Sequence, residues 1–255
     1  MVRRTYRGGV STSEHAADAV DLSIVVPAWN EAKTLPATLE ALRSAVARLG
    51  LVPDAVEILV VDDGSDDGTA SVAEAAGVRV LSGHWRQIAA VRNAGARATR
   101  GRMLVFVDAD TIVPGETLAR AVGAMRSGAV GGGANVAIDE PAPWAIRLPL
   151  WVFMTTYRLL GYAAGCFVFA TREAFEQVGG FDERFYASEE IGLTKRLREL
   201  GRFEKVRPPV TTSARKVRLY RPWPLFRQTV SLLLQGPAAW QSREGLGIWY
   251  DGRRE

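Results

Sequence analysis

Short aliphatic runs alternate with helical patterns through the first half of the chain, and this alternation limits the folds that it can adopt. The runs that we expect to form strands span residues 22–26, 56–61, 78–81 and 103–107. Runs of this kind are typical of parallel strands that are buried on both faces. Helical patterns lie between and after them, at residues 35–49, 69–76, 88–98 and 116–125. Strand–helix units with short connections predict an α/β fold with a mostly parallel central sheet flanked by helices.

The alternation ends after residue 128. A glycine-rich strand predicted at 130–138 and another at 167–170 flank an apolar, aromatic segment at 141–160. No internal repeat or low-complexity linker separates the halves, so we predict one continuous domain. Its first half would bind a cofactor, and its second half would complete the site.

Two aspartates, Asp108 and Asp110, follow the strand predicted at residues 103–107. Side chains two positions apart on a strand point to the same side, and open α/β sheets bind ligands at the carboxyl ends of their strands. Two carboxylates there suit a hard divalent cation such as Mg²⁺ or Mn²⁺, which in turn suits a bound diphosphate. The alternative is an ordinary turn, because aspartate is common where strands end.

The residue inventory limits how a metal could be held. The 255 residues include one cysteine, Cys166, and two histidines, His15 and His84. An internal disulfide, a cysteine-based zinc site and a histidine cluster are therefore excluded. Any metal must be held by oxygen ligands.

Positive charge is concentrated late in the sequence. The basic residues of this stretch are Arg202, Lys205, Arg207, Arg215, Lys216, Arg218, Arg221 and Arg227. No helix-turn-helix, zinc-finger or RNA-recognition motif accompanies them, so we do not expect nucleic acid as a partner. We favour phosphate groups of a nucleotide or of a membrane surface, and a solvated basic face is the alternative.

The sequence also bears on contact with a membrane. Residues 1–21 are polar and lack the apolar run of a signal peptide, so we expect a flexible leader. The apolar segment at 148–169 is long enough to cross a bilayer but contains Arg158 and two glycines. We interpret it as buried or interfacial rather than spanning. We therefore expect a cytoplasmic protein, with peripheral contact at the inner membrane face as an option.

Six motifs in one order resemble those of the family 2 inverting glycosyltransferases. They lie at residues 24–31, 60–69, 91–95, 106–110, 178–182 and 188–190. The resemblance spans roughly residues 22 to 200, and it implies the GT-A fold, a nucleotide-diphospho-sugar donor and a divalent metal. We therefore expect three parts: a flexible leader at 1–21, a GT-A domain at 22–212 and a basic, aromatic extension at 213–255. Within the domain, residues 22–128 would bind the nucleotide-sugar and residues 129–212 the acceptor.

The resemblance also assigns residues to the donor. Pro27, Trp29 and Glu31 would lie at its base and ribose, and Asp63 would accept a hydrogen bond from the base. Because Asp62 and Asp63 would point in opposite directions on a continuing strand, we expect only one of them to face the ligand.

Three further donor-site assignments follow from the resemblance. Arg92 would lie near the base or the diphosphate. Asp108 would reach the ribose or a metal-bound water, and Asp110 would ligate the metal. Considered singly, the aspartates of residues 62–67 could be turn and cap residues, and Arg92 could belong to a surface ion pair.

Glu190 aligns with the catalytic base of the family, which would activate the acceptor. That base is commonly an aspartate preceded by a glutamate, whereas this chain has Glu189 followed by Glu190. The choice between the two glutamates therefore stays open, and two solvated acids in the first turn of a helix are the alternative. The chain also lacks a histidine in its second half, where some relatives supply a further metal ligand, so water and diphosphate oxygens would have to fill those positions. It has no Gln-x-x-Arg-Trp motif and no expected transmembrane helix, which argues against a processive polysaccharide synthase.

The acceptor is the least specified part of the prediction. An apolar segment beside a cationic stretch would suit a lipid acceptor such as a polyprenyl phosphate or a glycolipid, while a small molecule or a protein side chain remains open. A nucleotidyltransferase is the alternative among enzymes, but residues 27–31 lack its glycine-rich, basic phosphate loop. A non-catalytic sugar-nucleotide-binding or membrane-associated partner protein is the alternative from another class.

Overall fold

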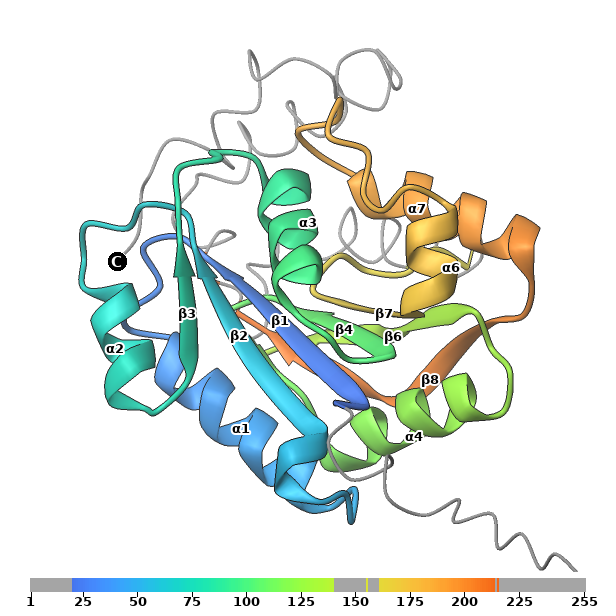
Figure 1. Cartoon of the computed structure of the whole chain (residues 1–255), viewed down its shortest axis with the longest axis horizontal. Helices are drawn as coiled ribbons and strands as arrows, with labels where there is room; N and C mark the ends of the chain where they lie inside the picture. The colour runs from blue at the N-terminus through green and yellow to red at the C-terminus, as the bar shows by residue number, and fades with distance from the viewer. Residues whose placement is uncertain (1–19, 140–154, 156–160, 214, 216–255) are drawn as a thin grey trace, which may run out of the picture.

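The computed structural model describes residues 20–139, 155, 161–213 and 215, and these residues form an eight-stranded sheet with helices on both faces (Figure 1). The strands are β1 (Leu22–Ala28), β2 (Val56–Asp62), β3 (Arg79–Ser82), β4 (Met103–Val107), β5 (Thr111–Ile112), β6 (Gly131–Ile138), β7 (Phe167–Thr171) and β8 (Phe203–Thr212). The helices are α1 (Leu35–Ala47), α2 (Thr69–Ala75), α3 (Ile88–Ala98), α4 (Gly115–Arg126), α6 (Arg172–Gln177) and α7 (Glu189–Leu200), and a 3₁₀ turn spans Pro53–Ala55. The leader, the apolar segment at 141–160 except Thr155, and residues 216–255 lie outside this description.

The strands follow the order β3-β2-β1-β4-β7-β6-β8-β5 across the sheet. The first four strands in the chain pair in parallel, as their aliphatic sequences predict. Strand β7 is antiparallel to both β4 and β6, and β6 is parallel to β8. The prediction of an α/β fold with a mostly parallel central sheet is therefore confirmed, and every antiparallel pair includes a strand of the second half, β7 or β8.

Strand β8 was not predicted, because its residues look unlike a strand. It contains Arg207, Pro208 and Pro209, and proline cannot donate a hydrogen bond to a neighbouring strand. Long pairing with β6 compensates for this, and a register shift between Ala134 and Val136 accommodates the prolines. The short strand β5 and the short helix α6 were also not predicted from the hydrophobic pattern.

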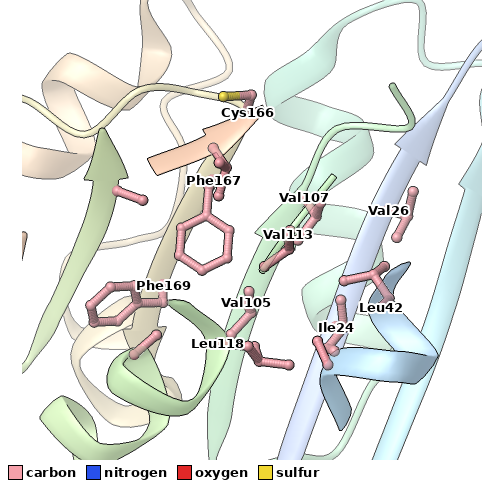
Figure 2. Packing of buried hydrophobic residues seen from close by; sticks show 14 of the residues in the cluster. Ile24, Val26, Leu42, Val105, Val107, Val113, Leu118, Cys166, Phe167 and Phe169 are labelled. Carbon is pink, nitrogen blue, oxygen red and sulfur yellow. The ribbon is translucent and has the colours of Figure 1, made fainter. Parts of the chain in front are cut away.

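The two faces of β1 supply two separate layers of core. Ile24 and Val26 pack with residues of α1 and α4, as Figure 2 shows, whereas Val25 belongs to the cluster on the opposite face. Helices α1, α2 and α4 cover the first face, and α3, α6 and α7 cover the second (Figure 1). Burial on both faces explains why these strands are continuously aliphatic rather than alternating.

Helix α3 packs unusually close to the sheet. A Cβ atom at Gly95 would lie 2.3 Å from Cγ1 of Val25 and 2.9 Å from Cγ2 of Val61, so only glycine fits there. Below α3, the ring of Phe106 packs edge-on against Phe181 with centroids 5.0 Å apart. This packing fixes the position of α3, which carries Arg92. No helix in the described part of the chain is both long and apolar enough to cross a membrane.

Candidate active site

The predicted site residues lie at one edge of the sheet. Because β1, β2 and β4 are parallel, their carboxyl ends meet at the same edge, and the loops that follow them begin at residues 29, 63 and 108. This edge is where open α/β sheets bind their ligands.

The loops after β1 and β2 are tied together by side chains. The backbone N–H of Asn30 donates to Oγ of Ser65 at 2.9 Å, and the N–H of Glu31 donates to Oγ1 of Thr69 at 2.8 Å. Asp67 accepts a hydrogen bond from the N–H of Ala32 at 3.0 Å. The later polar residues of the 62–69 loop therefore have a structural role, as turn and cap residues.

Asp62 and Asp63 have different surroundings, as expected for adjacent residues at a strand end. Oδ1 of Asp63 accepts the N–H groups of Trp85 and Arg86 at 2.6 and 2.9 Å. Burial raises the pKa of Asp63, and these two hydrogen bonds only partly oppose it. Oδ1 of Asp62 is also buried but has no hydrogen-bond partner among the described residues. An unmatched buried acceptor of this kind needs a donor, so Asp62 competes with Asp63 for the role of ligand contact.

Pro27 and Trp29 lie at the carboxyl end of β1, Pro27 within the strand and Trp29 directly after it. The guanidinium of Arg86 lies over the Trp29 ring, 4.8 Å from its centroid. Asn30 and Arg86 both have positive φ angles, 54° and 52°. This backbone conformation is strained for residues other than glycine, and such strained residues cluster near functional sites. Pro27 is buried within β1 opposite Val61, so it shapes the strand end rather than presenting a polar group.

Arg92 is the central cation of the site, not a surface residue. Its side chain is only 2% exposed. Its guanidinium forms ion pairs with Asp108 at 2.7 Å and with Glu189, and donates to the carbonyl of Gly165 at 2.8 Å. Burial alone would lower the pKa of Arg92, but the charges of Asp108 and Glu189 outweigh it and the pKa is raised. Arg92 therefore stays charged and fixes two acids from different parts of the chain.

The two adjacent glutamates at the start of α7 are not equivalent. The Glu189 side chain is 5% exposed and is held by Arg92, whereas Glu190 is half-buried. The Glu190 carboxyl lies beside Gly165: a Cβ atom built there would be 3.6 Å from Oε2 of Glu190 and 3.5 Å from Nη2 of Arg92. A carboxylate thus lies next to the Arg92–Asp108 pair.

Asp110 lies among groups that the motif analysis missed. Its Oδ1 accepts a hydrogen bond from Oγ1 of Thr212 at 3.2 Å, and its Oδ2 lies 4.0 Å from Nη2 of Arg215. Arg215 binds both carboxylate oxygens of Glu31 at 2.6 Å. Sequence analysis placed Arg215 in a basic stretch, and no local pattern marks it as a partner for a residue 184 positions away.

The described residues offer few ligands for a divalent metal. They contain no cluster of three or more acidic, histidine or cysteine side chains that could hold one. Asp108 and Asp110 do offer hard carboxylate oxygens at the end of β4. Mg²⁺ is typically held by one or two carboxylates together with substrate phosphates and water, and this donor set suits that pattern.

A sheet of this order, with an aspartate pair after β4 and acids at the start of α7, is a GT-A glycosyltransferase architecture. TarS of S. aureus, solved in complex with UDP-GlcNAc, matches with a TM-score of 0.61 and 17% identity, over 82% of this chain and 64% of that chain. The mannosyltransferase PcManGT of Pyrobaculum calidifontis, solved with GDP-Man and Mn²⁺, matches with a TM-score of 0.59 and 22% identity, over 82% of this chain and 61% of that chain. These matches confirm the predicted fold.

The family model described as glycosyl transferase family 2 matches residues 23–179, and the chain belongs to this family. An undecaprenyl-phosphate 4-deoxy-4-formamido-L-arabinose transferase of Pseudomonas aeruginosa is 37% identical over 112 residues, which are 40% of this chain and 32% of the relative. The succinoglycan biosynthesis protein ExoO of Rhizobium meliloti is 36% identical over 124 residues, or 47% of this chain and 33% of the relative. The match thus spans about a third of the length of these relatives.

Proposed function

We propose that this protein transfers a sugar, with inversion, from a nucleotide-diphospho-sugar to an acceptor hydroxyl. The observation that carries the proposal is the placement of Glu190: a half-buried carboxylate beside the Arg92–Asp108 pair, at the sheet edge where open α/β folds generally bind ligands. Family membership and the fold support a nucleotide-sugar donor, because the solved neighbours were captured with UDP-GlcNAc and GDP-Man.

Inverting transfer is an in-line displacement, so the two sides of the anomeric carbon need different help. The leaving diphosphate must be stabilised, and the attacking hydroxyl must lose a proton. A divalent metal held by Asp110, with Asp108 beside it, would neutralise the developing charge on the diphosphate. Glu190 takes the hydroxyl proton on the opposite side, and Glu189 does not, because its carboxylate is engaged by Arg92.

The other site residues position the donor. Trp29, whose ring is covered on one face by Arg86, would stack its other face on the base, and Asp62 or Asp63 would accept a hydrogen bond from the base. Arg92 positions Asp108, because its guanidinium is shared between Asp108, Glu189 and a backbone carbonyl. We therefore do not expect Arg92 to contact the donor directly.

Substitution of Asp110 by Asn tests the donor site. The variant keeps the size and the hydrogen bond with Thr212 but loses the anionic oxygen, so metal-dependent donor binding is expected to weaken at least about tenfold. A thermal-shift screen of UDP-, GDP-, dTDP- and CDP-sugars, with and without Mn²⁺, measures this, since a ligand that binds the folded state raises its melting temperature.

Asp54→Asn is the matched control, because Asp54 is exposed in the 3₁₀ turn before β2, at the opposite end of the parallel strands. It should behave as the wild type. Equal metal dependence in Asp110→Asn and wild type would refute the assignment of Asp110. A folded wild-type protein that none of the four nucleotide-sugars stabilises would refute the proposed donor class.

A polyprenyl phosphate is the second candidate acceptor, and the undecaprenyl-phosphate transferases among the relatives favour it. Such an acceptor would place the protein at the inner face of the membrane. Its phosphate is already ionised near neutral pH and needs no base. Transfer assays that compare a water-soluble hydroxyl acceptor with a short polyprenyl phosphate, each with wild type and a Glu190 variant, separate the two candidates.

A further inference from the structure

Arg215 occupies the acidic edge that the proposed function assigns to the metal and the diphosphate. Its side chain is 6% exposed, and its Nη2 lies 2.6 Å from each carboxylate oxygen of Glu31 and 4.0 Å from Oδ2 of Asp110. Glu31 follows β1 and Asp110 follows β4, which are neighbouring strands. One guanidinium therefore compensates two carboxylates at the point where a metal would bind.

The guanidinium also has spare hydrogen-bonding capacity. Its Nε is buried and has no hydrogen-bond partner among the described residues. A buried guanidinium N–H without a partner is costly, and the group that best satisfies it is an anionic oxygen in bidentate geometry, as in a phosphate. Arg215 is thus suited to exchange a carboxylate for a phosphate.

We propose that Arg215 is the resident counter-ion of the metal-binding carboxylates and makes metal binding depend on the donor's diphosphate. Without donor, a metal must displace a cation that is already paired with Glu31 and close to Asp110, so the metal binds weakly. When a diphosphate arrives, it supplies a new partner for the guanidinium, and Asp110 is released to the metal. This inference rests on the proposed function, because it takes Asp110 as the metal ligand.

Mn²⁺ binding in the absence of any sugar tests the inference without an activity assay. Titration followed by electron paramagnetic resonance of free Mn²⁺ gives the dissociation constant for wild type and Arg215→Gln. Because the variant lacks the competing charge, it is expected to bind Mn²⁺ at least about tenfold more tightly than wild type. Arg215→Lys keeps the charge and should stay close to wild type.

The same titrations in the presence of UDP, GDP, dTDP or CDP measure the coupling. Coupling between two ligands is reciprocal, so the nucleotide should tighten Mn²⁺ binding in wild type and do so much less in Arg215→Gln. Arg120→Gln, which removes an exposed arginine of α4, controls for net charge and should match wild type. Glu31→Gln/Arg215→Gln removes both charges of the ion pair, so that no buried glutamate loses its cation; it too should bind Mn²⁺ more tightly than wild type.

The outcomes separate this inference from the function on which it rests. If wild type binds UDP, GDP, dTDP or CDP in an Mn²⁺-dependent way, but Mn²⁺ alone binds Arg215→Gln and the double variant no more tightly than wild type, the counter-ion role is refuted and the proposed function stands. If Mn²⁺ promotes the binding of none of UDP, GDP, dTDP and CDP in any variant, both are refuted.

Discussion

Replacement of Glu190 by Gln is expected to lower turnover by about a hundred- to ten-thousand-fold, with donor affinity nearly unchanged. The reason is that glutamine keeps the size and polarity of the side chain but cannot take the proton from an acceptor hydroxyl. Glu190 lies beside the Arg92–Asp108 pair and is not the glutamate that Arg92 holds. Single-turnover rates with saturating donor, together with donor dissociation constants, measure the two effects separately.

Glu189→Gln is the matched comparison, because it makes the same change one residue earlier. We expect it to destabilise the protein, since Arg92 loses a buried partner, and to affect turnover less than Glu190→Gln. The reverse ranking of turnover would transfer the role of base to Glu189. A Glu190→Gln variant that transfers as fast as wild type to a polyprenyl phosphate, and not to a hydroxyl, would establish the phosphate acceptor.

Replacement of Arg92 by Met is expected to reduce the free energy of unfolding by about 3–5 kcal/mol. Methionine can fill much of the space, but it leaves Glu189 buried and Asp108 half-buried without their common cation. Removing one member of a buried ionic network costs more than the network contributes, because the remaining charges stay desolvated. Chemical denaturation followed by fluorescence measures the change.

Arg97→Met on the same helix is the control for this substitution. The Arg97 side chain is 67% exposed, and its one ion pair, with Glu183, is long at 4.0 Å. Its loss should therefore change the free energy of unfolding by no more than about 0.5 kcal/mol. The double variant Arg92→Met/Glu189→Gln should recover part of the loss, since it also removes a buried charge. A cost below about 1 kcal/mol for Arg92→Met would show that the ion pairs are not the support that we infer.

The first half of the fold, and the meeting of the candidate donor-site residues at one edge of the sheet, could be predicted from local sequence. Buried parallel strands such as β1 and β4 are almost entirely apolar, so their sequences identify them without knowledge of the neighbouring strands. The position of Asp108 and Asp110 at a strand end follows from the same pattern. The two aspartates were expected to point to one site, and they do share an edge, but Asp108 is held by Arg92 and Asp110 contacts Thr212.

The second half was harder to predict because its stability comes from long-range pairing. Strand β8 carries prolines and charges, and it is a strand only because β6 offers a partner along its length. The basic residues of the same stretch looked alike in sequence, yet Arg215 is buried against Glu31.

The sequence alone determined the class of this protein, because its strand–helix order and its ordered motifs depend on residues close together in the chain. The tertiary structure decided which charges meet. Two adjacent glutamates on a helix point about 100° apart, and only the placement of α7 on the same face of the sheet as α3 settles which of them forms the ion pair with Arg92. The contact of Arg215 with Glu31 likewise joins residues 184 positions apart, and ion pairs over such separations leave no periodic signal in a sequence.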